Sequence, residues 1–156
     1  MADDTIHLRE IFKTGIAMET QGEAFYNGLA ENAKDPKAKS LFNKLAQAER
    51  HHKELIESIL VKWEPLAADK GSGDLLAREV KFRGIFANPP SEYSAEEDAV
   101  KYAIDQEKKM ADFYRSFESI FSDPWKMMHI SQMVAEEMGH IKNLVTLYPQ
   151  FKTQTA

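Results

Sequence analysis

Two segments of this chain carry the same pattern of glutamate, tyrosine and histidine, 88 positions apart. Each segment has a Glu, a Tyr seven residues later, and a Glu-x-x-His motif whose Glu lies 30 positions after the first. Carboxylates and imidazoles are common ligands of divalent transition metals. Because the whole set occurs twice, the sequence predicts a site for two metal ions. The predicted ligands are Glu19, Glu49, His52, Glu107, Glu137 and His140, and the accompanying tyrosines are Tyr26 and Tyr114.

Ionised carboxylates are costly in an apolar core unless they are paired or bound to a metal. Four carboxylates in one layer would also repel one another, and most would have to stay protonated. Two divalent cations would balance this charge. A site with oxygen and nitrogen ligands and no sulfur suits iron or manganese, with zinc possible. We expect Glu19 and Glu107 to be terminal ligands, Glu49 and Glu137 to bridge, and His52 and His140 to bind one metal each.

Four helical patterns of apolar residues position these ligands, and no segment has the alternation of a β-strand. Residues three apart share one face of a helix, so each Glu-x-x-His motif can reach a single metal ion. The second and fourth helices each open with Asp-Pro, an N-cap residue followed by proline in the first turn. A Ser-x-x-Glu capping box opens the third helix, and Pro149 should end the fourth. The predicted helices cover about residues 6–32, 36–61, 95–121 and 124–148.

Connection lengths predict the arrangement of these helices. The links at 33–35 and 122–123 are short, so the helices they join should be antiparallel. The crossover at 62–94 is long enough to run the length of the bundle, which makes the second and third helices parallel. In each half the two glutamates are equally far from the short turn, so they lie at one height. The sequence predicts a single all-α domain over 1–156, a four-helix bundle with repeats at about 6–61 and 95–148 related by an internal pseudo-twofold axis.

Composition excludes several classes of function. The 156 residues are 43% hydrophobic and 29% charged, which fits one soluble globular domain. A net charge of −5 gives no indication of nucleic-acid binding. The chain has no cysteine, which excludes disulfides, thiolate metal sites and a cysteine nucleophile. We see no apolar run of about 18 residues and no secretory signal, so we expect no membrane association and a cytoplasmic location.

This pattern resembles the ferritin-like di-iron carboxylate proteins, in which two helices supply one Glu each and two others supply Glu-x-x-His. Within that group it is most similar to rubrerythrins and bacterioferritins, where a tyrosine follows the first ligand by seven residues. The segment from Glu19 to Tyr26, followed by Glu49-Arg-His-His52, carries this likeness. The resemblance implies a ferritin-like fold, and we expect the tyrosine hydroxyls to hydrogen-bond to metal-bound carboxylates, although plain core aromatics are the alternative.

The chain departs from those families at three points. Rubrerythrins with peroxidase activity usually carry a rubredoxin domain with four cysteines, and this chain has none. They also have a further Glu three residues after the third-helix ligand, where this chain has Met110. Bacterioferritins have a haem-binding Met after the second-helix Glu, where this chain has Arg50, so we predict no haem. The chain therefore resembles a stand-alone rubrerythrin-type domain.

The leading hypothesis for function is an oxidoreductase that reduces hydrogen peroxide or dioxygen at a di-iron centre. An external donor, a rubredoxin-like protein or a flavoprotein, would supply the electrons. We expect a homodimer, with Trp63, Phe82 and Phe86 exposed near the crossover. The alternatives are an iron-binding or storage protein with a ferroxidase centre, and a structural bundle whose metals only neutralise the core.

Other polar residues near the motifs are secondary candidates. Glu23 lies one turn after Glu19 and is either a spare ligand or, because its repeat partner is Ala111, a solvated or supporting residue. Glu136 should point away from the apolar stripe towards the surface. His7, His51 and His129 have no histidine counterpart in the repeat and are expected to be ordinary histidines.

Overall fold

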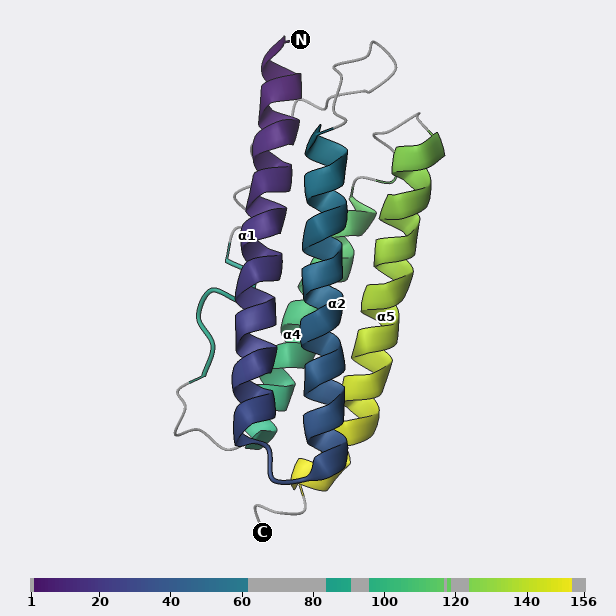
Figure 1. Cartoon of the computed structure of the whole chain (residues 1–156). Helices are drawn as coiled ribbons and strands as arrows, with labels where there is room; N and C mark the ends of the chain where they lie inside the picture. The colour runs from purple at the N-terminus through teal and green to yellow at the C-terminus, as the bar shows by residue number, and fades with distance from the viewer. Residues whose placement is uncertain (1, 62–83, 91–95, 117, 119–123, 153–156) are drawn as a thin grey trace.

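Four long helices form the molecule, seen here in a computed structural model that describes residues 2–61, 84–90, 96–116, 118 and 124–152. The described residues contain no β-strand. Figure 1 shows the helices side by side as a four-helix bundle, with the two termini at opposite ends. The predicted all-α four-helix bundle is therefore confirmed. The helices are α1 (Ala2–Asn32), α2 (Pro36–Val61), α4 (Glu96–Arg115) and α5 (Pro124–Lys152).

The bundle is built from two antiparallel helix pairs. The backbones of α1 and α2 pack closely along their length, as do those of α4 and α5, and the pairs approach each other most closely between α2 and α5. Helices α2 and α4 run in the same direction in Figure 1, as the long crossover predicted. The two halves of the sequence therefore face each other across the bundle, which places their matching residues in one core.

Local sequence explains where the second helix begins. The Asp35 side chain accepts a hydrogen bond from the Lys37 backbone N–H at 3.3 Å, and Pro36 occupies the first helical position. The first turn of α4 carries the acidic residues Glu96, Glu97 and Asp98, where the helix dipole favours negative charge. The predicted capping serine of α4 lies outside the described residues.

Two predicted helix ends were wrong. Helix α5 continues through Pro149 to Lys152, although the sequence predicted an end before the proline. Proline removes one backbone hydrogen bond near the end of the helix, and the preceding Tyr148 anchors the turn by packing on the core and donating to Glu97 of α4 at 2.8 Å. Helix α4 ends at Arg115 instead of continuing to about residue 121, and the Ser116 hydroxyl bonds to the Phe113 carbonyl at 2.6 Å.

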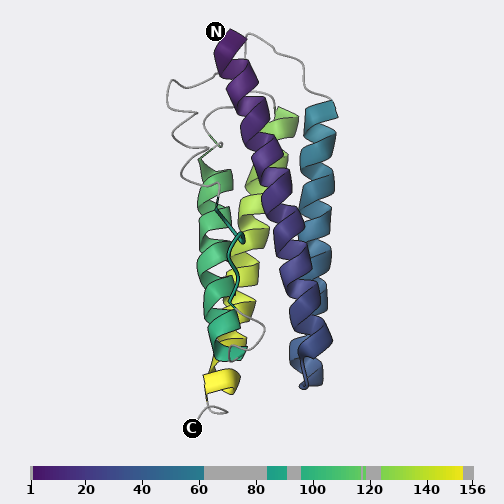
Figure 2. The same cartoon turned by 90° about the vertical axis from the view of Figure 1, so that its left-hand side faces the viewer.

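Part of the crossover covers the gap between α1 and α4. Residues 84–90 run along these two helices, as Figure 2 shows. Phe86 was expected to be exposed but is only 2% exposed, because its ring packs against Phe25, Tyr26 and Tyr102. Its φ of 59° is uncommon for a residue with a side chain, and its N–H bonds to the buried Gln106 Oε1 at 2.7 Å. Trp63 and Phe82 lie outside the described residues.

The core is apolar except at one layer. Its largest fully buried side chains include Phe12, Phe42, Phe113 and Leu45. In the described part of the chain, four glutamates, one glutamine and one histidine are buried among them. None of the described helices combines the length and the low polarity needed to cross a membrane.

Candidate metal centre

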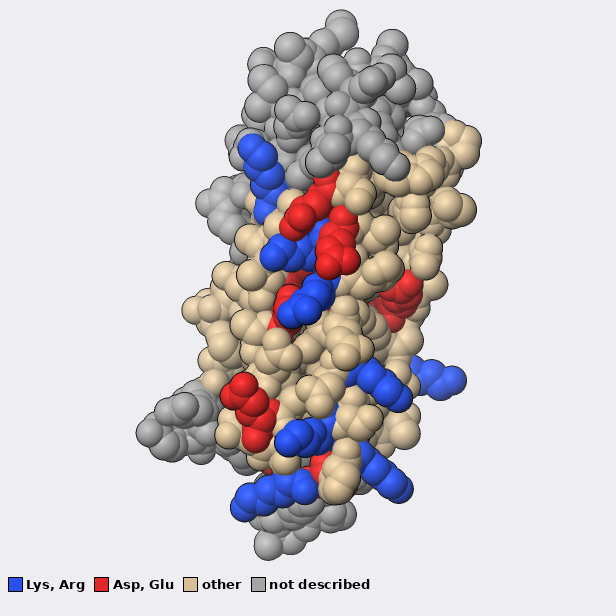
Figure 3. Space-filling view, viewed as in Figure 1, with Lys and Arg blue, Asp and Glu red and all other residues tan. Residues whose placement is uncertain are grey.

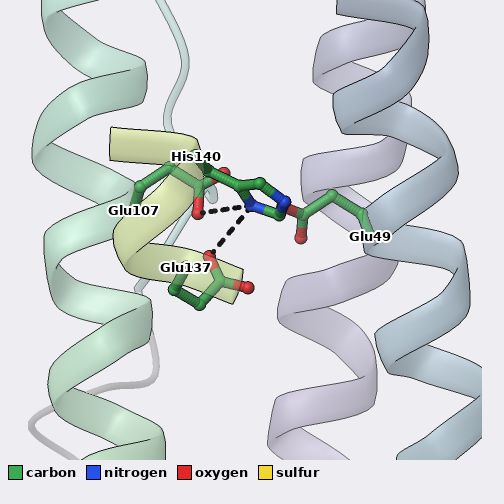
Figure 4. A group of neighbouring side chains, drawn as sticks. All are labelled: Glu49, Glu107, Glu137 and His140. Carbon is green, nitrogen blue, oxygen red and sulfur yellow. Dashed lines mark ion pairs between the residues drawn. The ribbon is translucent and has the colours of Figure 1, made fainter. Parts of the chain in front are cut away.

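All six predicted ligands converge in the interior of the bundle. Five of them have no exposed surface, and the side chain of His140 is 13% exposed. They form two groups, and within each group all the ligand atoms lie within 4.8 Å of one another. Figure 4 shows the first group, in which α4 and α5 supply three residues and Glu49 reaches towards them from α2. One group is Glu49, Glu107, Glu137 and His140, and the other is Glu19, His52 and Glu137.

Glu137 belongs to both groups and lies between the two histidines. Its Oε1 is 2.7 Å from His52 Nδ1, and its Oε2 is 3.5 Å from His140 Nδ1. One oxygen faces each histidine, an arrangement that a bridging carboxylate would need, and the bridging role stays a prediction for this residue. Glu19 and Glu107 each belong to a single group, which fits terminal ligands, and they lie 3.5 Å and 3.6 Å from the histidine of their own half. Glu49, the second predicted bridge, falls in the group of His140 only.

Most of the oxygen and nitrogen atoms that could bind a metal in this cluster lack the hydrogen-bond partners that buried polar atoms normally have. His52 Nδ1 and Glu137 Oε1 are close, yet neither makes a hydrogen bond in the described structure. Buried polar atoms without partners call for an explanation such as a bound ion. A set of carboxylate oxygens and imidazole nitrogens that all face one space fits divalent transition metals. The unpartnered atoms in the cluster are Glu19 Oε2, both oxygens of Glu49, His52 Nδ1, Glu107 Oε2, both oxygens of Glu137, and His140 Nδ1.

Charges in the cluster are strongly coupled. Burial, followed by repulsion from Glu19 and Glu107, raises the pKa of Glu49 well above its ordinary value. Burial and the negative charge of Glu107 likewise raise the pKa of Glu137. Burial alone would also raise the pKa of Glu107, but interactions with Glu137 and His140 lower it to about 2. Without a cation, the cluster therefore holds protons on some carboxyl groups to limit its charge.

His140 carries an additional proton for the same reason. Burial would lower its pKa, but the neighbouring Glu107 and Glu137 raise it to about 10. Metal ions bind the unprotonated imidazole and the ionised carboxylate, so binding would replace these protons with cationic charge.

The two tyrosines connect the halves of the repeat. The Tyr26 hydroxyl on α1 donates to Glu107 Oε1 on α4 at 2.7 Å, and the Tyr114 hydroxyl on α4 donates to Glu19 Oε1 on α1. The predicted hydrogen bonds to candidate ligand carboxylates are thus present, and each one crosses to the opposite half. Burial, and then the charge of the partner glutamate, raises the pKa of both hydroxyls, which keeps them protonated.

Residues beside the motifs have different roles from one another. Glu23 lies outside both groups and pairs with Arg50, whose Nη2 is 2.8 Å from Glu23 Oε1. Glu136 was predicted to be a surface residue. Its side chain is 32% exposed, and its Oε2 contacts Nε2 of the buried His52, a contact that was not predicted. The contact could not be predicted from the sequence, because the two residues come from different halves of the repeat. The repeat counterpart of Glu136 is Ala48, which cannot make such a contact. His51 is exposed, His129 packs its ring on Trp125, and the side chain of His7 lies outside the described part.

The fold and this cluster agree with the comparison to known families. The profile described as Rubrerythrin matches residues 10–148. The chain belongs to the rubrerythrin family. Its fold is ferritin-like. The rubrerythrin family together with the carboxylate–histidine cluster indicates a di-iron type of site and iron binding. No curated protein sequence matches this rubrerythrin-family chain.

Two solved structures share the fold of this rubrerythrin-family chain. A hypothetical protein from Pyrococcus furiosus is 19% identical, with a TM-score of 0.72 over 94% of this chain and 91% of that one. A protein from Thermotoga maritima, described as a ferritin-like diiron-carboxylate protein, is 18% identical, with a TM-score of 0.69 over 90% of this chain and 93% of that one. At these identities the likeness establishes the fold alone.

Proposed function

We propose that this protein reduces hydrogen peroxide or dioxygen at a carboxylate-bridged di-iron centre, with electrons from an external donor. The observation that carries the proposal is the buried cluster in which Glu137 offers one oxygen to each of two histidine-containing groups. Such a cluster can hold two ions close enough to act on one small oxidant. Its burial excludes bulk water and larger substrates from the same space.

Two iron ions are the proposed occupants, with manganese or zinc as competing metals and no haem. Glu19 and His52 would hold one ion, Glu49, Glu107 and His140 the other, and Glu137 would be shared between them. When bound, two ferrous ions supply the two electrons that one peroxide molecule needs. Arg50, at the position where bacterioferritins bind haem, is engaged with Glu23.

The chain itself provides proton control around the oxidant. Reduction of one hydrogen peroxide to two waters consumes two electrons and two protons. Tyr26 and Tyr114 each hold a hydroxyl proton against a candidate ligand, Glu107 and Glu19 respectively. These two hydroxyls are the proposed catalytic groups, because they are buried and protonated beside the space where the oxygen atoms would be reduced.

An external electron donor is part of this proposal, and the lack of cysteine supports it. The chain has no cysteine and so no thiolate iron site of its own that could pass electrons to the centre. A rubredoxin-like protein or a flavoprotein is the proposed donor, and a homodimer is the proposed assembly.

Anaerobic loading with ferrous iron, followed by rapid mixing with peroxide or with dioxygen, tests the proposal. We expect a visible absorption band of an oxo-bridged diferric centre to form faster than free ferrous iron oxidises. Glu137→Gln should abolish this fast phase, whereas the matched variant Glu23→Gln, on a glutamate paired with Arg50 outside the cluster, should retain it. Oxidation no faster than that of free iron would refute the proposal. Gel filtration separates a dimer from the hollow multi-subunit shell that iron storage requires.

A further inference from the structure

The surroundings of the two histidines do not obey the symmetry of the repeat. His52 and His140 are equivalent positions, and each directs Nδ1 towards the carboxylates of its own group. Glu136 of α5 contacts the other nitrogen of His52, Nε2. The pseudo-twofold axis relates Glu136 to Ala48 of α2. A methyl group accepts no hydrogen bond, so Ala48 cannot give His140 the support that Glu136 gives His52.

Glu136 has a defined role in positioning His52. With its Nε2–H donated to the Glu136 carboxylate, the imidazole would present the lone pair of Nδ1, the atom that faces Glu19 and Glu137, to a bound cation. Gln132, one turn earlier on α5, donates to the second oxygen of Glu136 at 3.1 Å and so holds the carboxylate in place. Its repeat counterpart is Lys44, which has no amide to offer. This chain of contacts therefore fixes both the tautomer and the ring orientation of one histidine only.

The two histidine side chains also differ in how deeply they are buried. The His52 side chain has no exposed surface, whereas that of His140 is 13% exposed. One histidine is thus enclosed and held from behind, and the other lies nearer to solvent without a carboxylate at the equivalent position.

We propose that the two metal half-sites are inequivalent. The half-site of Glu19 and His52 binds a divalent cation first and more tightly, because Glu136 positions its histidine. The half-site of Glu107 and His140 binds second and exchanges its cation more readily, which allows a centre with two different metals. This inference rests on the two-metal occupancy proposed above and not on any redox reaction there.

Titration of the metal-free protein with cobalt(II), followed by calorimetry and by the visible cobalt spectrum, tests this inference without any turnover. We expect two binding phases for one chain. Glu136→Ala should weaken the tighter phase about 10- to 100-fold and leave the looser phase unchanged, the usual effect of removing a carboxylate behind a ligating histidine. Glu136→Gln, which keeps an acceptor oxygen, should restore most of the affinity. Glu23→Ala is the matched control, since it removes a glutamate outside both groups and should change neither phase.

Two further variants assign the phases. His140→Ala should retain one tight cobalt ion, and His52→Ala should lose the tight phase. Ala48→Glu should tighten the looser phase, and combined with Glu136→Ala it should exchange the order of filling. Circular dichroism of each metal-free variant checks that the bundle is intact. If Glu136→Ala fails this check, a comparison of Glu136→Gln with the original protein tests the contact with His52.

Two equal sites in the original protein, or an effect of Glu136→Ala on both phases or on neither, would overturn the inference while leaving the di-iron proposal intact. Binding of fewer than two ions would overturn both. Two unequal sites with no oxidation by peroxide or dioxygen would refute only the proposed function.

Discussion

Gly22 of α1 lies against the side chain of Glu49, and its substitution by alanine is a sensitive test of the site. A Cβ atom at this position would be 3.0 Å from Glu49 Oε2, 3.2 Å from its Cδ and 3.3 Å from Phe86 Cδ2. Ordinary van der Waals contact begins at 3.4 Å. Gly22→Ala should therefore displace the Glu49 carboxylate by a few tenths of an ångström, away from the position it shares with Glu107 and His140.

The size of the effect follows from two opposing contributions. Replacing glycine by alanine inside a helix gains about 1 kcal/mol. Inserting a methyl group into a filled core costs about 1–3 kcal/mol. Gly22→Ala should thus leave the metal-free protein between unchanged and about 2 kcal/mol less stable. Gly28→Ala and Gly139→Ala are the matched controls, because no atom lies within 4 Å of either added Cβ, and each should stabilise the protein by about 1 kcal/mol.

Metal binding should reveal the displaced carboxylate. Each tenfold loss of affinity removes about 1.4 kcal/mol from the stabilisation that a bound cation provides. Urea unfolding of the three variants, with and without saturating cobalt(II), measures both effects. We expect Gly22→Ala to lose part of its metal-dependent stabilisation, and the two controls to keep all of it. If Gly22→Ala were as stable as Gly28→Ala and bound metal as well as the original protein, Glu49 would not lie against α1 and the geometry of the site would be wrong.

Three other predictions follow from the same cluster. Glu49→Gln should stabilise the metal-free protein, and the gain should grow as pH rises above the ordinary carboxyl pKa of 4.5, because burial and neighbouring charge raise the pKa of Glu49 and make its ionisation unfavourable in the fold. Urea unfolding of both proteins at several pH values measures this gain, and equal stability of the two at all pH values would contradict it. Metal loading at pH 7 should release protons, nearly one of them from His140, whose pKa is about 10, and the affinity for the metal should fall as pH decreases. Calorimetry in buffers of different ionisation enthalpy counts the released protons, and a count of zero would exclude a protonated cluster. Gln106→Leu should lower the free energy of unfolding by about 1–3 kcal/mol, because it leaves the buried Phe86 N–H without its acceptor. Urea unfolding measures this loss, and an unchanged unfolding midpoint would mean that this hydrogen bond does not hold the crossover in place.

Much of the centre was predictable because a helix has a fixed period. Glu49 and His52 lie three residues apart, so they share a face wherever the helix goes. Because the pattern recurs 88 positions later, Glu137 and His140 must likewise share one face of their helix. The short turn at 33–35 places Glu19 and Glu49 at the same height in the first helix pair. These relations hold within one helix or across one turn, which is why sequence alone could establish them.

Contacts between the halves were decided by the tertiary structure. Nothing in the sequence specifies that the Tyr26 hydroxyl meets Glu107 and not a glutamate of its own half. The contact of Glu136 with His52 depends on how closely α5 approaches α2 and on the rotation of each helix about its axis. The burial of Phe86 depends on the path of the crossover across α1 and α4. Helix packing fixes these distances through the fit of many side chains at once, and no local period in the sequence records that fit.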